Sequence, residues 1–239
     1  MIRFLAPGLP DDPLLPDTES AHCVRVLRHS KGDIIEVTDG ASNLYSCRIV
    51  DDNPRGVLME IVEVNSVPNP WNGHVTIAVA PTKNSDRMEW MLEKMTEIGL
   101  DCFVPLRTSR SERKDIKIER LEKIVAAAVK QSLKTVIPEI RPVTDFKSFV
   151  SSIGPDTDKF IAWCEDHSEK RDLCSLMKPD REVVVLIGPE GDFTQEEAAF
   201  AMEHGFVPVT LGKCRLRTET AGLVALDTFH FLDRQQNTN

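Results

Sequence analysis

Two segments near the C-terminus combine glycines with charged side chains, and these residues are the most suited to chemistry in this sequence. The first is IGPEGDF at residues 187–193, and the second is LGKCRLRTETA at residues 211–221. A glycine after a buried strand permits positive φ and lets a ligand approach the backbone closely. Two such loops at one end of a sheet form a ligand crevice. We therefore predict a binding site built from both segments.

The charged residues of these segments limit what the crevice can hold. A carboxylate at Glu190 repels phosphate and suits a ligand that offers hydroxyl or amine donors. Arg215 and Arg217 can hold a phosphate or a carboxylate through two parallel hydrogen bonds. Glu219 lies at the start of the following helix, where the helix dipole favours an acidic group. Two plainer interpretations stay open: a tight turn without a ligand, and simple capping of the last helix by Thr218.

Several common catalytic patterns are missing from the sequence. The glycine segments contain neither GxGxxG nor the Lys-Ser or Lys-Thr that ends a phosphate-binding loop. The sequence has no HExxH motif and no GxSxG elbow, and its six histidines are dispersed. We expect no metal site.

Composition points to an intracellular globular protein. The chain has 239 residues and a net charge of −9, which argues mildly against nucleic acid as a partner. The six cysteines are scattered without a CxxC pair, which predicts reduced thiols and a cytoplasmic location. No apolar run is long enough to span a membrane, and a signal peptide is not expected.

The basic residues gather in three clusters despite the acidic average, and each cluster is either a solvated surface or a recognition site. The clusters are Arg25, Arg28, His29 and Lys31; then Arg107, Arg110, Arg113, Lys114 and Lys117; then Arg215 and Arg217.

Two domains are expected from the pattern of strands and helices. Residues 1–67 are rich in short strands, at 33–40, 44–50 and 57–64, with a short helix near 21–27, as in a small β-barrel. Two prolines in residues 67–70 mark the linker.

Residues 73–239 alternate strands with helices, which predicts an α/β fold with a parallel sheet covered on both faces. We expect strands at 75–80, 103–106, 159–164, 182–187 and 206–211. Ser85 or Asp86 should cap the first helix, and Thr194 with Glu197 should form a capping box on a later one.

The glycine segments resemble the C-terminal signature of the SPOUT-class methyltransferases. Within that class, the chain resembles the bacterial 16S ribosomal RNA uridine-N3 methyltransferase family. Further matches are HCVRVLR at 22–28, RME at 87–89, KMTEIG at 94–99, Arg110-Ser111, and Gln131-Ser132 with Pro138. Departures from the family pattern occur at Asp192, which replaces a usual glycine, and at Cys214, Arg215 and Lys130.

The resemblance implies a PUA-like RNA-binding β-barrel followed by a SPOUT domain with a trefoil knot, and a homodimer. It implies methyl transfer from S-adenosylmethionine to N3 of a uridine in the 16S rRNA of the small ribosomal subunit. Arg217 and Glu219 are the expected catalytic residues. The expected methyl-donor contacts are Ile187, Gly188, Pro189, Glu190, Gly191, Leu211, Gly212, Arg215 and Leu216. The expected RNA contacts are Arg25, Arg28, Lys83, Arg110 and Arg113.

Two alternatives follow from the same residues. One is a SPOUT methyltransferase that acts on another RNA site. The other is a non-catalytic RNA-binding protein whose pocket is vestigial.

Overall fold

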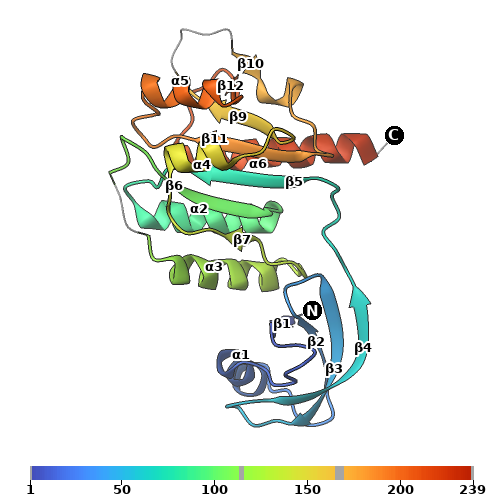
Figure 1. Ribbon diagram of the computed structural model, residues 1–239. Helices are drawn as coiled ribbons and strands as arrows, with labels where there is room; N and C mark the ends of the chain where they lie inside the picture. The colour runs from blue at the N-terminus through green and yellow to red at the C-terminus, as the bar shows by residue number, and fades with distance from the viewer. Residues whose placement is uncertain (1, 113–115, 165–169, 238–239) are drawn as a thin grey trace. The chain divides into compact units, whose positions relative to one another are not determined.

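The computed structural model describes residues 2–112, 116–164 and 170–237, and the chain divides into two compact units (Figure 1). The first unit contains Met1–Pro70 and Ala126–Ile137, and the second contains Trp71–Val125 and Pro138–Asn239. Arg113, one of the expected RNA contacts, lies outside the described residues.

The first unit is built on a four-stranded sheet in the order β1-β2-β3-β4. Its strands are β1 (Arg3–Leu5), β2 (Ile34–Thr38), β3 (Asn43–Asp51) and β4 (Leu58–Ser66), and its helices are α1 (Asp17–Ala21) and the π-helical turn η1 (His22–Val26). The expected hairpin forms, because β2 pairs with β3 in antiparallel register. Strand β1 was not expected, and its three residues are too short to show a periodic pattern.

Residues 126–137 complete the first unit through polar contacts. The buried carboxylate of Glu19 forms an ion pair with Lys130, and it also accepts a hydrogen bond from the Leu5 amide at 3.3 Å. The Arg3 guanidinium donates to the carbonyl of Leu133, and Thr135 donates to the carbonyl of Val67. Lys130, a departure from the family pattern, thus neutralises a buried charge.

The second unit contains an eight-stranded sheet whose main path is β10-β12-β9-β11-β5-β6-β7. The strand pairings of the described sheet are all parallel, and β8 pairs with β6. The strands are β5 (His74–Val79), β6 (Cys102–Arg107), β7 (Glu139–Ile140), β8 (Thr144–Asp145), β9 (Asp158–Ala162), β10 (Arg171–Asp172), β11 (Glu182–Ile187) and β12 (Val207–Thr210). Central strands β5 and β11 are buried on both faces after their first residue, which explains their unbroken apolar sequence.

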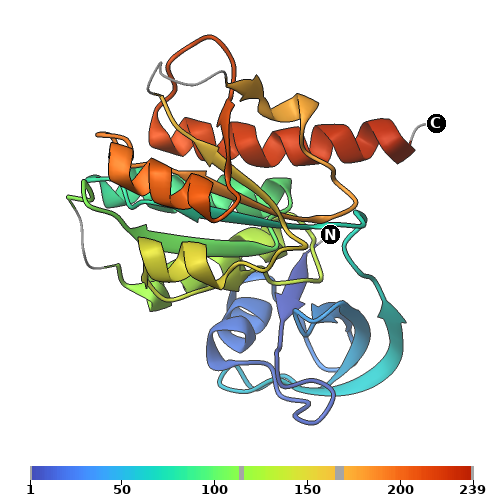
Figure 2. The same ribbon diagram turned by 45° about the horizontal axis from the view of Figure 1, so that its top comes forward.

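Helices cover both faces of this sheet (Figure 2). Helices α2 (Ser85–Ile98) and α6 (Thr218–Asn237) pack together on one face, and α4 (Phe146–Ser152) and α5 (Gln195–Glu203) pack together on the other. Helix α3 (Ile118–Gln131) and the short 3-10 turn η2 (Leu173–Ser175) complete the elements of the described chain.

Helix caps follow the sequence only in part. The capping box of α5 forms as predicted between Thr194 and Glu197. The cap of α2 is Asn84, whose side chain accepts from the Asp86 amide at 2.8 Å, so the prediction of Ser85 or Asp86 was wrong. Three cap-competent residues stand in succession here, and local preference cannot choose among them.

The carboxyl ends of β5, β9, β11 and β12 meet at one edge of the sheet, because these strands are parallel and in register. The loops that follow them therefore gather at that edge. No helix among the described residues is long and apolar enough to cross a membrane.

Candidate functional site

A pocket of about 1010 Å³ opens at this edge of the sheet. All nine residues predicted as methyl-donor contacts line it, together with the two predicted catalytic residues and Arg110. The two glycine segments, which are separated along the chain by β12 and α5, therefore face one space. The volume lies at the upper end of the range for small-molecule and cofactor sites.

Asp192 organises the first glycine loop. Its backbone is left-handed, with φ of 60°, and its amide donates to the carbonyl of Pro189 at 2.9 Å. One carboxylate oxygen accepts from the Cys164 amide at 2.8 Å, and the other accepts from the Phe193 amide at 2.8 Å. The side chain thus ties the loop after β11 to the chain after β9, which a glycine at this position could not do.

Gly188 is required by close packing inside the same loop. A β-carbon at this position would lie 3.1 Å from a carboxylate oxygen of Asp192 and 3.2 Å from the Phe193 nitrogen. Both atoms belong to the hydrogen-bonded turn, so a larger residue would displace it.

Arg110 supports the outer side of this loop. Its guanidinium donates to the carbonyl of Gly191 at 2.7 Å and to that of Phe193 at 3.3 Å. The turn that carries Arg110 is held in place by Glu197, which accepts from the Ser109 amide at 2.7 Å. Arg110 therefore stabilises the first glycine loop and also lines the pocket at its solvent-exposed edge.

The second glycine loop is more open. Gly212 has φ of 114°, and a β-carbon there would meet no atom within 4 Å. Thr218, the first residue of α6, donates its hydroxyl to the carbonyl of Gly188 at 3.0 Å. The two loops are thus connected by a buried hydrogen bond.

Glu219 lies in the wall of the pocket beside a residue that the sequence analysis did not assign to the site. The Glu219 side chain is only 10% exposed, and Arg87 on α2 approaches it with a nitrogen–oxygen distance of 3.6 Å. Arg215 and Arg217 are exposed and also line the pocket. Arg87 was noted only as part of the RME motif, and no spacing rule connects it to a glutamate 132 positions later.

The loop between β5 and α2 contacts the first glycine loop through Glu190. The Lys83 amide donates to Glu190 at 3.0 Å, while the Lys83 ammonium pairs with Glu112 at 2.9 Å. One oxygen of Glu190 is therefore engaged by the protein itself. The Lys83 and Glu112 side chains are 77% and 61% exposed, so this pair is accessible to solvent.

Other lining residues also escaped prediction, among them Trp163 and Cys164, which follow β9, and Lys170, which precedes β10. Burial first, and then the nearby Asp192 carboxylate, raise the pKa of the Cys164 thiol. These residues carry no recognisable motif, and the parallel pairings of β9 with β11 and β12, and of β10 with β12, bring them to the pocket.

The remaining predicted RNA contacts in the first unit are exposed. Arg25 lies in η1, and Arg28 follows it in the left-handed conformation, with φ of 62°. Within the described residues, no group of three or more His, Cys, Asp or Glu side chains is arranged to hold a metal ion.

Comparison with known proteins identifies both units. Residues 69–230 match the family model of the RNA methyltransferase domain, and residues 15–62 match that of the RNA methyltransferase PUA domain.

Named relatives align with most of the chain. Ribosomal RNA small subunit methyltransferase E of Synechocystis is 34% identical over 84% of this chain and 67% of its own length. The protein of that name from Bacillus subtilis is 28% identical over 89% of this chain and 87% of its own.

Solved structures agree with these matches. A probable rRNA methyltransferase from Porphyromonas gingivalis is 39% identical, with a TM-score of 0.95 over 99% of this chain and 100% of its own. Ribosomal RNA small subunit methyltransferase E from Neisseria gonorrhoeae, bound to S-adenosyl methionine, is 28% identical, with a TM-score of 0.85 over 97% of this chain and 98% of its own. The chain therefore belongs to the RNA methyltransferase family of ribosomal RNA small subunit methyltransferase E, with a SPOUT-class domain and a PUA domain.

Proposed function

We propose that this protein transfers a methyl group from S-adenosylmethionine to N3 of a uridine in 16S ribosomal RNA. The observation that carries the proposal is the pocket in which both glycine loops meet a pair of arginines and a buried glutamate. Relatives named as small-subunit rRNA methyltransferases support the reaction class. The solved relative that holds S-adenosyl methionine supports the donor.

The pocket fits the methyl donor in size and chemistry. Its apolar contacts come from Ile187, Leu211 and Leu216, and its glycines leave backbone groups open to an adenosyl moiety. S-adenosylmethionine supplies an electrophilic methyl group on a sulfonium. In this proposal residues 187–191 and 211–216 hold the donor mainly through apolar contacts and main-chain hydrogen bonds.

Methylation of uridine N3 requires a lone pair on that nitrogen, and therefore loss of the N3 proton. The carboxylate of Glu219 is the candidate acceptor for this proton, or the group that orients the base. Arg217 stabilises the negative charge that spreads over the deprotonated base. The base then uses both electrons of the former N3–H bond for the new N–CH₃ bond, while the S–CH₃ bond of the donor breaks, its electron pair stays on sulfur, and S-adenosylhomocysteine leaves.

Charge in the pocket favours an anionic substrate, although the whole chain carries −9. Six arginine and lysine residues line the pocket against three aspartates and glutamates: Arg87, Arg110, Lys170, Lys213, Arg215 and Arg217 against Glu190, Asp192 and Glu219. The local field is thus positive where the RNA must enter, and the acidic average does not oppose RNA binding.

Methyl transfer in vitro tests the proposal. Purified small subunits that lack the modification are incubated with labelled S-adenosylmethionine, and their nucleosides are then separated by mass spectrometry. We expect label in 3-methyluridine, with single-turnover rates about 100-fold lower for Arg217→Ala. Near-normal turnover by this variant would remove Arg217 from the mechanism.

The same assay separates the two rival functions. Label in a different methylated nucleoside would indicate a methyltransferase that acts on another base. A vestigial pocket would show no heat of S-adenosylmethionine binding in calorimetry, whereas the proposed function requires binding.

RNA contacts are proposed at Arg25, Arg28, Lys83 and Arg110. Each phosphate contact that is removed should flatten the salt dependence of RNA binding by slightly less than one unit of slope. The Arg25→Ala/Arg28→Ala double variant should therefore lose about 1.5 units. Arg48→Ala is a matched control, because Arg48 is an exposed arginine of the same unit that is not among the proposed contacts.

We also propose a knotted homodimer that acts in the cytoplasm, as the family resemblance implies. Phe231 on α6 is 47% exposed and borders an apolar hollow lined by Ile98, Leu223 and Val224. A second copy could bury this surface. Light scattering should give twice the chain mass, and Phe231→Asp should shift the protein toward the monomer.

A further inference from the structure

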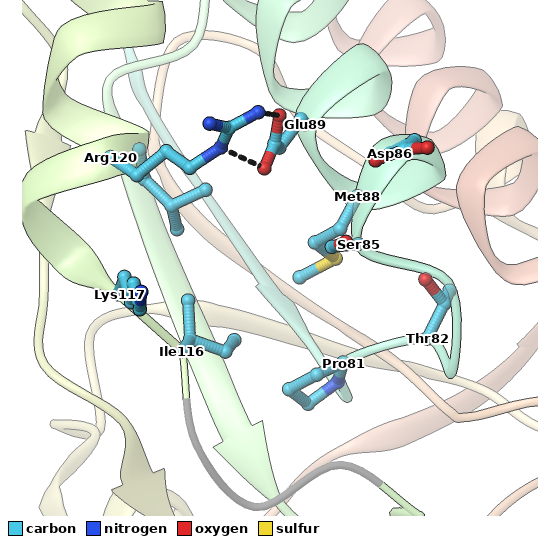
Figure 3. A pocket seen from close by; sticks show the side chains of 10 residues that line it. Pro81, Thr82, Ser85, Asp86, Met88, Glu89, Ile116, Lys117 and Arg120 are labelled. Carbon is cyan, nitrogen blue, oxygen red and sulfur yellow. Dashed lines mark hydrogen bonds and ion pairs between the residues drawn. The ribbon is translucent and has the colours of Figure 1, made fainter.

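A second, smaller pocket of about 200 Å³ lies between the first turns of α2 and α3, and none of the residues assigned above to donor binding or chemistry lines it (Figure 3). The residues that line it come from the loop after β5, from α2, and from the start of α3. They are Pro81, Thr82, Ser85, Asp86, Met88, Glu89, Ile116, Lys117, Arg120 and Leu121.

Apolar and polar side chains contribute about equally to the lining of this pocket. Figure 3 shows the side chains of Pro81, Met88 and Ile116 around one space. Met88 is only 3% exposed, so its thioether forms a fixed wall. Ser85 and Asp86 make no side-chain hydrogen bond to another described residue, so their oxygens can serve a ligand. A small pocket that combines apolar side chains with hydrogen-bonding groups suits a flat ring that carries hydrogen-bonding edges.

The charges around this pocket favour a neutral ring over a phosphate. Arg120 is held by Glu89 through two contacts, one of them 2.7 Å long, and Figure 3 shows both. Asp86 and Lys117, the two lining charges without an ion-pair partner among the described residues, are opposite in sign. The lining therefore lacks the excess positive charge that binding of a phosphate requires.

Helix α2 connects the small pocket to the proposed methyl-donor pocket. Arg87 lines the large pocket, while its neighbours Asp86 and Met88 line the small one. The two pockets thus flank one helix, which is about 10–12 Å wide with its side chains. One or two nucleotides of splayed single-stranded RNA span such a distance.

We propose that this pocket binds an unpaired base next to the methylated uridine. Enzymes that modify a base must take it out of its stack, and a splayed neighbouring base then needs a binding surface of its own. The Asp86 carboxylate only accepts hydrogen bonds, so it favours a base edge that offers N–H donors, such as an exocyclic amino group. This inference rests on the proposed function and assigns RNA recognition to a site that takes part in neither donor binding nor methyl transfer.

An abasic scan combined with pocket variants tests this inference. Synthetic RNA hairpins carry the target uridine and one abasic nucleotide at each flanking position in turn. For the wild-type protein, one position should lower kcat/KM about tenfold, the typical effect of losing one stacked base. Ser85→Phe fills the pocket and should lower kcat/KM on intact RNA by a similar factor, with no further loss at that abasic position.

Asp86→Ala is a second variant with little risk to folding, because Asp86 is exposed. It should lower kcat/KM about fivefold on RNA with an amino-bearing base at that position, and not on the abasic RNA. Glu119→Ala removes an exposed carboxylate from the first turn of α3 without lining the pocket, and it should match the wild type.

The outcomes separate this inference from the proposed function. Calorimetric affinity for S-adenosylmethionine should stay unchanged in Ser85→Phe and Asp86→Ala. If the wild type methylates all abasic RNAs equally well, or if the variants lose the same factor on every RNA, no base occupies the pocket. If the wild-type protein methylates none of the RNAs, the result contradicts the proposed methyltransferase function itself, and not only the binding of a base in the small pocket.

Discussion

Replacement of Asp192 tests how the pocket is held together, because this residue combines two separable properties. Its carboxylate accepts hydrogen bonds from the amides of Cys164 and Phe193, each at 2.8 Å. Its backbone has φ of 60°, a conformation that glycine adopts freely and that most other residues avoid. Substitutions can remove one property and keep the other.

The structure sets an order of stability for three variants. Asp192 is half-buried, so we assign about 1 kcal/mol to each of its two hydrogen bonds. Asp192→Asn keeps one acceptor oxygen and should cost about 1 kcal/mol. Asp192→Gly loses both bonds without backbone strain, for about 2 kcal/mol, and Asp192→Ala adds about 1 kcal/mol of left-handed strain, for about 3 kcal/mol.

Urea unfolding followed by tryptophan fluorescence measures these differences. All three tryptophans, Trp71, Trp90 and Trp163, belong to the second unit, so their signal reports the unit that contains the pocket. Equal losses for the alanine and glycine variants would show that backbone strain is absent. A loss below about 0.5 kcal/mol for alanine would refute the role of the carboxylate.

The reactivity of the Cys164 thiol tests the contact between Asp192 and Cys164 independently. Burial and the Asp192 charge both raise the pKa of Cys164, so little thiolate exists at neutral pH. Asp192→Asn removes the charge, lowers this pKa toward its ordinary value, and should speed alkylation by iodoacetamide at pH 8. Peptide mass spectrometry identifies the site, and an unchanged rate would contradict the contact.

Three further predictions follow from other parts of the structure. Arg87→Ala should lower kcat more than tenfold with little change in donor affinity, because the Arg87 cation holds Glu219 in the pocket wall. Arg87→Lys keeps the charge and should recover part of the lost kcat. If both variants have the same kcat, the ion pair has no part in catalysis. Gly73→Ala should destabilise the second unit by about 2 kcal/mol or more in urea unfolding, since a β-carbon there would lie 2.2 Å from the backbone oxygen of Pro179. An unchanged urea midpoint would show that the backbone moves to accommodate the β-carbon. Burial raises the pKa of Cys47 to about 11 and that of Cys102 to about 12. The folded state therefore retains these protons to a higher pH than the unfolded state. The resulting contribution to the free energy of unfolding is fully present below about pH 9 and is lost as the pH rises from 9 toward 11. The loss is about 1 kcal/mol per thiol for the first pH unit. Urea titrations at pH 8.5 and 10 should show the loss, and Cys102→Ala should reduce it.

Much of the pocket could be predicted from the sequence because its parts follow buried strands directly. The prediction of a strand at 182–187 matches β11 residue for residue, since the five consecutive apolar residues after Glu182 leave little choice. Strands that end in glycine and run parallel must bring their loops to one edge. Sequence reasoning therefore selected nine residues that all line one pocket.

The features of the site and fold that could not be predicted from the sequence depend on tertiary contacts. Arg87 reaches Glu219 only because α2 and α6 pack on the same face of the sheet. Thr218 was expected to cap its own helix, yet its hydroxyl donates to Gly188 across the pocket. Residues 126–137 join the first unit through the Lys130–Glu19 ion pair and other polar contacts, and no periodic pattern records such pairings.

The most direct test of the central claim is mass spectrometry of 16S rRNA nucleosides from cells that lack this gene. The account predicts that 3-methyluridine disappears from the small subunit, that the wild-type gene restores it, and that Arg217→Ala does not. An unchanged amount of 3-methyluridine in the deletion strain would contradict the account.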